Sequence, residues 1–203
     1  MSRTLFIALG IFFTIVASVT GLVIIPNWQY QELAPVKTRD GRQYPNPHYG
    51  EAALGRKIYV DQGCIYCHTQ QVRAKNYGGD IRRGWGLRRS VARDYLYDFP
   101  HQLGTIRTGP DLSNIGARQP SLNWHYLHLY DPEITSAGSV MPKYKYFFNT
   151  LPPTADPPPN AVKLPPSFAT PNAGFIVPNE RGRHLVAYLK SMDRNFDLPE
   201  AKQ

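Results

Sequence analysis

The chain has 203 residues, a formal net charge of +8 and only two cysteines. Two cysteines are too few for a disulfide framework, so the fold must rest on a packed core. Once an apolar N-terminal segment is set aside, roughly 150 residues remain, which suits one domain with a single core.

The N-terminus predicts a membrane anchor. Thr4 to Ile25 is an uncharged run of 22 residues rich in Phe, Ile, Val and Leu. As a helix it would extend about 33 Å, enough to cross a hydrocarbon core of about 30 Å. A cleaved secretory signal would have an apolar stretch of only about 7 to 15 residues. We therefore expect an uncleaved transmembrane anchor over residues 1–26, with Trp28 and Tyr30 at the lipid–water boundary.

The next segments predict a tether and then a helix. Residues 27–50 contain several prolines, which favour an extended, semi-rigid tether. Residues 51–62 follow as a short helix, with Leu54 and Ile58 four positions apart on one face. We expect the folded domain to span residues 51–203.

The five residues from Cys64 to His68, CIYCH, form the C-x-x-C-H motif of covalent c-type haem attachment. The two thiols can add to the two vinyl groups of one porphyrin, and the neighbouring imidazole can ligate the iron. A zinc site would need two more ligands, and a redox C-x-x-C would need a βαβ setting that the sequence does not show. The motif predicts one covalent haem c, with Cys64 and Cys67 as attachment sites and His68 as an axial ligand.

Haem attachment also indicates an orientation. Arg3 precedes the apolar run, and positive charge beside a span tends to stay cytoplasmic. Since c-type haem is attached on the outer face in bacteria, we expect a single-pass protein of the bacterial inner membrane. Its haem domain would lie in the periplasm.

Much of the positive charge lies in residues 72–93. This stretch contains seven lysines and arginines against Asp80 alone. It could be a solvated loop, or it could contact anionic lipid headgroups, an acidic partner or the haem propionates. Because the span and the outward topology separate the chain from nucleic acid, we do not expect nucleic-acid binding.

The remaining sequence predicts helices and irregular segments. Ser121 is a suitable N-cap for a helix that stops before Pro132, and a last amphipathic helix begins after Asn179. Residues 149–178 are rich in proline and cannot be helical, so we expect them to follow the surface or touch a partner. We find no run of strands and predict an all-α fold with long irregular loops.

Met141 is the expected second axial ligand. It lies in the short irregular segment Ser139-Val140-Met141-Pro142, and a haem that only carries electrons keeps both axial positions filled. Methionine and histidine together give a high reduction potential. Met192 falls on the apolar stripe of the last helix and is expected to pack in the core. The competing ligands are His125 and His128, and, less strongly, His48, His101 and His184.

Two further residues, Pro110 and Arg107, are candidates for supporting roles at the haem. Pro110 lies in the turn-like string Gly109-Pro110-Asp111-Leu112, and its carbonyl could accept the second ring N–H of His68. Arg107, three residues before Pro110, is a candidate partner for a haem propionate.

Several strings together resemble one family. They are CIYCHTQQVR from Cys64, RTGPDL from Arg107, WHYLHL from Trp124, Met141-Pro142, and LVAYLKS from Leu185. In this order they resemble subunit II, the membrane-anchored mono-haem cytochrome c subunit of cbb3-type cytochrome c oxidases.

The resemblance implies a small helical domain of the class I cytochrome c type, with thioether bonds at Cys64 and Cys67 and axial ligation by His68 and Met141. It implies partners as well: a haem–copper catalytic subunit, other cytochrome c subunits, and a cytochrome c or similar donor. In such a complex the chain would relay electrons and would not be an enzyme on its own.

Two alternatives remain open. The chain could be the anchored cytochrome of a nitric oxide reductase, which shares one span and one haem with methionine and histidine ligands. It could also be a haem peroxidase or gas sensor, which would require an open iron site. The Thr-Gln-Gln-Val-Arg continuation after His68 argues against the first, and Met141 argues against the second.

Overall fold

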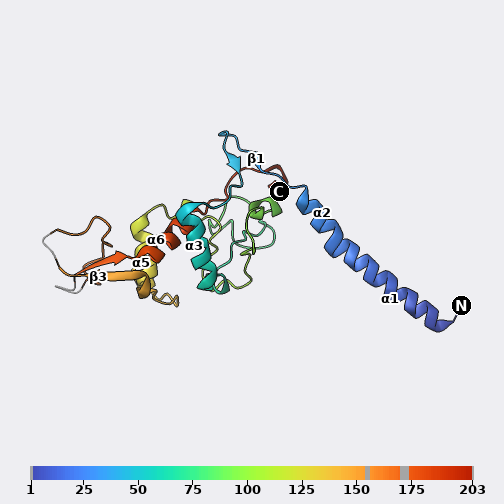
Figure 1. Cartoon of the computed structure of the whole chain (residues 1–203), viewed down its shortest axis with the longest axis horizontal. Helices are drawn as coiled ribbons and strands as arrows, with labels where there is room; N and C mark the ends of the chain where they lie inside the picture. The colour runs from blue at the N-terminus through green and yellow to red at the C-terminus, as the bar shows by residue number, and fades with distance from the viewer. Residues whose placement is uncertain (1, 154–155, 170–173, 203) are drawn as a thin grey trace. The chain divides into compact units, whose positions relative to one another are not determined.

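The computed structural model describes residues 2–153, 156–169 and 174–202 (Figure 1). The chain divides into two compact units. One comprises residues 1–45 with 92–96, and the other comprises residues 46–91 with 97–203. The N-terminal unit contains the membrane helix, and the second unit contains the haem motif.

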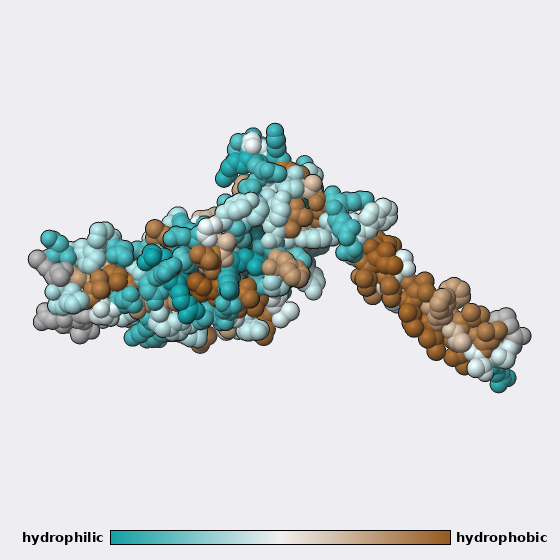
Figure 2. Space-filling view, in the orientation of Figure 1, coloured by the Kyte–Doolittle hydropathy of each residue, from teal (hydrophilic) through white to brown (hydrophobic). Residues whose placement is uncertain are grey.

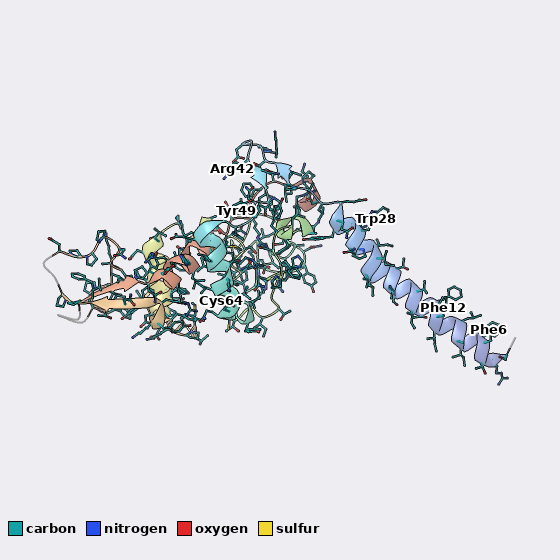
Figure 3. All side chains as sticks on the ribbon, in the orientation of Figure 1. Phe6, Phe12, Trp28, Arg42, Tyr49 and Cys64 are labelled. Atoms are coloured by element: carbon teal, nitrogen blue, oxygen red, sulfur yellow. The ribbon has the colours of Figure 1, made fainter. Side chains whose placement is uncertain are left out.

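A single apolar helix dominates the N-terminal unit. It comprises α1 (Arg3–Val19), a π-helical turn (Thr20–Ile24) and α2 (Ile25–Gln31), 29 residues in all. The Ser2 hydroxyl caps its start by accepting the Leu5 N–H at 3.3 Å. Figure 2 shows apolar residues along most of its length, and Figure 3 shows Phe6, Phe12 and Trp28 projecting outward from it. The helix is long and apolar enough to span a membrane.

The segment expected to be an extended tether is partly regular. The helix continues past Pro26 to Gln31, and the π-helical turn Thr20–Ile24 lies directly before the segment that contains this proline. Beyond it, β1 (Val36–Lys37) and β2 (Gln43–Tyr44) pair as a short antiparallel hairpin. The Tyr44 hydroxyl donates to Asp94 Oδ1 at 2.6 Å, which attaches the 3₁₀ turn Ala92–Tyr95 to this unit.

The second unit is mostly helical, as the sequence predicts. Its helices are α3 (Gly50–Asp61), α4 (Ile115–Arg118), α5 (Leu122–Tyr130) and α6 (Glu180–Ser191). The predicted N-cap is confirmed, since Ser121 Oγ accepts the Trp124 N–H at 3.3 Å. The last helix begins after Asn179, whose Oδ1 accepts the Gly182 N–H at 3.0 Å. Short 3₁₀ turns lie at 64–66, 132–134, 145–147 and 199–201.

The core lies where α3 crosses α6 (Figure 1). Tyr59 on α3 and Tyr188 on α6 are fully buried, with ring centroids 5.3 Å apart in an edge-to-face arrangement. Gly55 permits the close crossing, because a Cβ at that position would lie 1.8 Å from the His184 carbonyl oxygen. This crossing holds α3, and therefore the start of the haem motif, against the C-terminal helix.

Replacing Gly55 with alanine should destabilise the second unit. The added methyl group would meet backbone, which cannot turn aside, and overpacking of this kind costs about 1–3 kcal/mol. Urea denaturation of the purified chain should show this fall in the free energy of unfolding. Lys57→Ala, on the exposed side of the same helix, is the matched control and should change it by less than about 0.5 kcal/mol. Equal stability of the two variants would contradict the role of Gly55.

Two short strands pair at the two ends of the proline-rich segment, and the sequence did not predict these strands. Strands β3 (Phe148–Leu151) and β4 (Phe175–Pro178) pair in antiparallel register from Phe148↔Pro178 to Leu151↔Phe175. The strands have only four residues each and lie at the ends of the proline tract, where no alternating pattern is long enough to reveal them. Within the tract, buried Val162 donates its N–H to the Ile176 carbonyl at 2.8 Å and so ties the loop to β4.

Part of the basic stretch 72–93 has a structural role. The Arg89 guanidinium donates to the Glu200 carbonyl at 2.6 Å, and the Arg88 guanidinium donates to the Phe196 carbonyl. These bonds hold the C-terminal segment, which has no regular hydrogen-bond ladder of its own there. By contrast, Arg82 and Arg83 are exposed.

Candidate haem site

The C-x-x-C-H motif begins where α3 ends. Gly63 follows the helix with φ +65°, a left-handed conformation that favours glycine, and the chain then forms a 3₁₀ turn over Cys64–Tyr66. The His68 N–H donates to the Cys64 carbonyl at 3.0 Å, which closes the motif on itself. Figure 3 shows Cys64 at the C-terminal end of α3. The Cys64 side chain is half-buried and Cys67 is exposed.

The motif borders a cavity of about 470 Å³. Cys64, Cys67, His68 and Met141 all line it, although Met141 is more than 70 positions further along the chain. The cavity falls within the range of about 300–1,000 Å³ typical of ligand and cofactor pockets. The other lining residues are Gly63, Thr108, Gly109, Pro110, Ile115, Arg118, Gln119, Trp124, His128, Thr135, Ser136, Gly138, Ser139, Val140, Pro142 and Tyr144.

The His68 ring is held in a form suited to binding a metal. Its Nδ1 lies 2.7 Å from the Pro110 carbonyl oxygen. Because a carbonyl oxygen can only accept, Nδ1 carries the proton and the Nε2 lone pair stays available. Burial lowers the pKa of His68 below its usual value, which favours the neutral imidazole that a metal requires.

Gly109 also lines the cavity, and because it has no side chain its backbone can lie close to the His68 ring. Its N–H donates to the Cys67 carbonyl at 2.9 Å. A Cβ at this position would lie 2.2 Å from His68 Cε1, so a larger residue would overlap the imidazole where it now sits. Gly109 lies in a turn that the sequence predicts, but this contact joins segments about 40 residues apart and leaves no signal in the sequence.

Met141 lies in the irregular segment after α5, as expected, and is half-buried. Its N–H donates to Ser139 Oγ at 3.3 Å, and its side chain packs beside the core cluster. Met192 is 2% exposed, belongs to the core and does not line the cavity. The two methionines thus occupy different environments.

The two histidines of α5 differ in the same way. His125 is buried and does not line the cavity, and its Nε2 lies 2.9 Å from the Gln119 carbonyl oxygen. His128 lines the cavity, with Nδ1 2.5 Å from Thr135 Oγ1 and its ring stacked on Trp124 at 4.8 Å. Burial, and then the neighbouring His68 and His125, lower the pKa of His128 to about 4. It is therefore a neutral, polar group in the cavity wall.

The other histidines lie elsewhere. His48 Nε2 is 3.8 Å from Asp98 Oδ1, and His184 Nε2 is 3.9 Å from Glu180 Oε1. His101 is exposed. These three do not line the cavity.

Two arginines compete as partners for an anionic group. Arg107 does not line the cavity: its Nη1 pairs with buried Asp80 at 2.5 Å, and its Nη2 donates to the Gln71 carbonyl at 2.6 Å. Arg118, at the end of α4, does line it. The Arg118 Nη2 donates to the Asp111 carbonyl, while its buried Nε has no hydrogen-bond partner in the part of the chain that the structure describes. Burial also lowers the pKa of Arg118, a cost that a bound anion would offset.

The geometry does not favour the alternative uses of the cysteines. Burial raises the pKa of the Cys64 thiol to about 11, whereas redox-active cysteines have a lowered pKa. Among the described residues, no group of three or more His, Cys, Asp and Glu side chains could hold a metal ion. Two thiols and one imidazole on a large, partly apolar cavity instead fit a porphyrin that brings its own iron.

Comparison with known proteins agrees with this chemistry. A family model described as the cytochrome c oxidase mono-haem subunit, FixO, matches residues 2–160. The match covers the apolar helix, the C-x-x-C-H motif and Met141, while α6 lies beyond it. No curated protein matches the chain.

Proposed function

Because the chain belongs to the FixO family of mono-haem cytochrome c oxidase subunits, we propose that it relays electrons through a single haem c towards the oxygen-reducing subunit of a cbb3-type oxidase. One observation supports this above the others. Four residues with the chemistry to attach and ligate a haem, Cys64, Cys67, His68 and Met141, line one cavity. When bound, a haem c supplies a one-electron carrier.

We assign a role to each of these side chains. Cys64 and Cys67 hold the porphyrin by thioether bonds, and His68 and Met141 ligate its iron from the protein. The Pro110 carbonyl keeps the proton on His68 Nδ1, which leaves the Nε2 lone pair available for a metal. Ligation by both residues would leave no open position for small gases, and the chain would carry electrons without turning over a substrate.

We also propose Arg118, in place of Arg107, as the arginine that pairs with a haem propionate. Arg118 lines the cavity, and although its Nη2 donates to the Asp111 carbonyl, its buried Nε makes no hydrogen bond among the described residues. Arg107 does not line the cavity, and its guanidinium is paired with Asp80. A buried cation beside the cofactor stabilises the reduced haem, which carries one positive charge less than the oxidised form.

Replacing Arg118 with glutamine should therefore lower the reduction potential of the haem while leaving covalent attachment intact. A redox titration of the purified chain would measure this shift. Arg107→Gln is the comparison: it should destabilise the fold by leaving buried Asp80 with Arg73 alone, and it should shift the potential less. A larger shift for the Arg107 variant would reverse the assignment.

The remaining proposals concern location and partners. The helix from Arg3 to Gln31 would cross the bacterial inner membrane, with Arg3 on the cytoplasmic side and the haem domain in the periplasm. The haem–copper subunit and other cytochrome c subunits would be its partners in the membrane, and a cytochrome c or similar protein would be the electron source.

Purification of the complex tests the function. The tagged chain should co-purify from detergent-solubilised membranes with a haem–copper subunit, and the complex should consume oxygen. Nitric oxide consumption in place of oxygen consumption would contradict the proposal and support a nitric oxide reductase. Carbon monoxide binding to the reduced haem of the native chain would contradict it too, because it would show an open iron site.

A further inference from the structure

The buried carboxylate of Asp111 lies next to the residues that form the hydrogen bond between His68 and Pro110. Asp111 is fully buried and follows Pro110 in the chain. Its Oδ2 accepts the Thr69 hydroxyl at 2.6 Å and the Gln71 N–H at 2.7 Å, and its Oδ1 accepts the Ser113 N–H at 2.8 Å. A carboxylate accepting three donors at such distances is held in one position.

Two of these bonds, from Thr69 and Gln71, join two segments about 40 residues apart. One segment, residues 67–71, contains His68, and the other, residues 109–113, contains Pro110. Backbone bonds also join them, from Gly109 N–H to the Cys67 carbonyl at 2.9 Å and from Leu112 N–H to the Thr69 carbonyl at 2.8 Å. The Asp111 side chain adds two hydrogen bonds between the same two segments.

Pro110 itself cannot help to place its carbonyl. A proline has no N–H, so this residue makes no donor bond of its own to the 67–71 segment. The direction of its carbonyl depends on the residues on either side, Gly109 and Asp111. Asp111 accepts a hydrogen bond from Thr69, the residue after His68. A single buried side chain therefore fixes the position of the Pro110 carbonyl relative to His68 Nδ1, the two groups of the 2.7 Å bond.

We propose that Asp111 is a positioning residue that sets the reduction potential of the haem by holding the Pro110 carbonyl against His68 Nδ1–H. The inference rests on the proposed function, since it requires His68 to ligate a haem iron. A well-aligned bond from Nδ1–H makes the imidazole a stronger donor, which favours the oxidised metal and lowers the potential. Loosening the bond should raise the potential.

Thr69→Val tests this without changing any charge. The valine keeps the shape of threonine but removes the hydroxyl that donates to Asp111. We expect a higher reduction potential and, by NMR, about tenfold faster solvent exchange of the His68 Nδ1 proton. Thr69→Ser keeps the hydroxyl and should match the native chain in both measurements.

The sign of the shift separates positioning from a simple charge effect. Asp111→Asn should raise the potential in either case, because it removes both the charge and the cross-links. In Thr69→Val the charge remains and has lost a donor, so a purely electrostatic role for Asp111 predicts an unchanged or lower potential. Either of those results, or an unchanged exchange rate, would overturn the proposal.

The test also stands apart from the proposed function. Both measurements use the full-length haem-loaded chain in detergent, with the absorption spectrum recorded first. A spectrum of a haem with histidine and methionine ligands and an unmoved potential would remove the role of Asp111 and leave electron relay intact. Absence of haem from the native chain would remove the proposed function itself.

Discussion

Replacing Met141 with alanine is expected to open the haem iron to carbon monoxide. If Met141 supplies the sulfur ligand, its removal leaves one axial position without a protein group, and a reduced haem will then bind carbon monoxide. The reduction potential should fall as well, by a sizeable part of the range of about 0.8 V that axial ligands command. Absorption spectra of the reduced chain with and without carbon monoxide, together with a redox titration, would measure both effects.

Two control variants make this result specific. Met192→Leu changes a methionine in the core, 2% exposed, and should leave the spectrum and potential unchanged at a cost below about 1.5 kcal/mol. His128→Gln tests the competing ligand in the cavity wall and should leave the iron closed. If His128→Gln opened the iron and Met141→Ala did not, His128 would be the sixth ligand and the present assignment would be wrong.

Replacing Gly109 with alanine is expected to displace His68 from its ligating position. The added methyl carbon would lie 2.2 Å from Cε1 and 2.6 Å from Nδ1 of the ring, so the imidazole must turn and lose the Pro110 bond. Overpacking of about 1–3 kcal/mol would weaken ligation by a factor of about 5 to 150. The variant should carry covalent haem in reduced yield, with an iron that binds carbon monoxide on the His68 side.

The neighbouring Thr108 provides the matched control. It lines the same cavity but is exposed, so Thr108→Ala removes atoms without crowding the ring. Its haem content and spectrum should equal those of the native chain. If Gly109→Ala behaved in the same way, the close approach of this backbone to His68 would have no part in holding the cofactor.

The features that depend on neighbouring residues were predictable from the sequence. The apolar helix, the haem motif, and the helices after Ser121 and Asn179 follow from short-range patterns of hydrophobicity, spacing and capping, and the structure confirms these helices. Membership of the mono-haem oxidase subunit family was predicted from strings around the haem motif and is confirmed by the family match.

Features that depend on contacts between segments far apart in the sequence could not be predicted from such short-range patterns. The hairpin of β3 and β4 was missed because each strand is short and its partner lies across a proline-rich loop. Arg107 and Arg118 could not be ranked, since only the tertiary structure shows that Arg107 pairs with buried Asp80 and that Arg118 lines the cavity.

The sequence by itself determined the chemistry of this protein: which groups can attach and ligate a haem, and which segment can enter a membrane. Only the tertiary structure decided which of the remaining polar residues reach that site. His128 and not His125 lines the cavity, and the Asp111 carboxylate accepts a hydrogen bond from Thr69, the residue after His68. The reason is physical, because such placements depend on the summed packing of segments 40 or more residues apart, which local periodicity and capping do not encode.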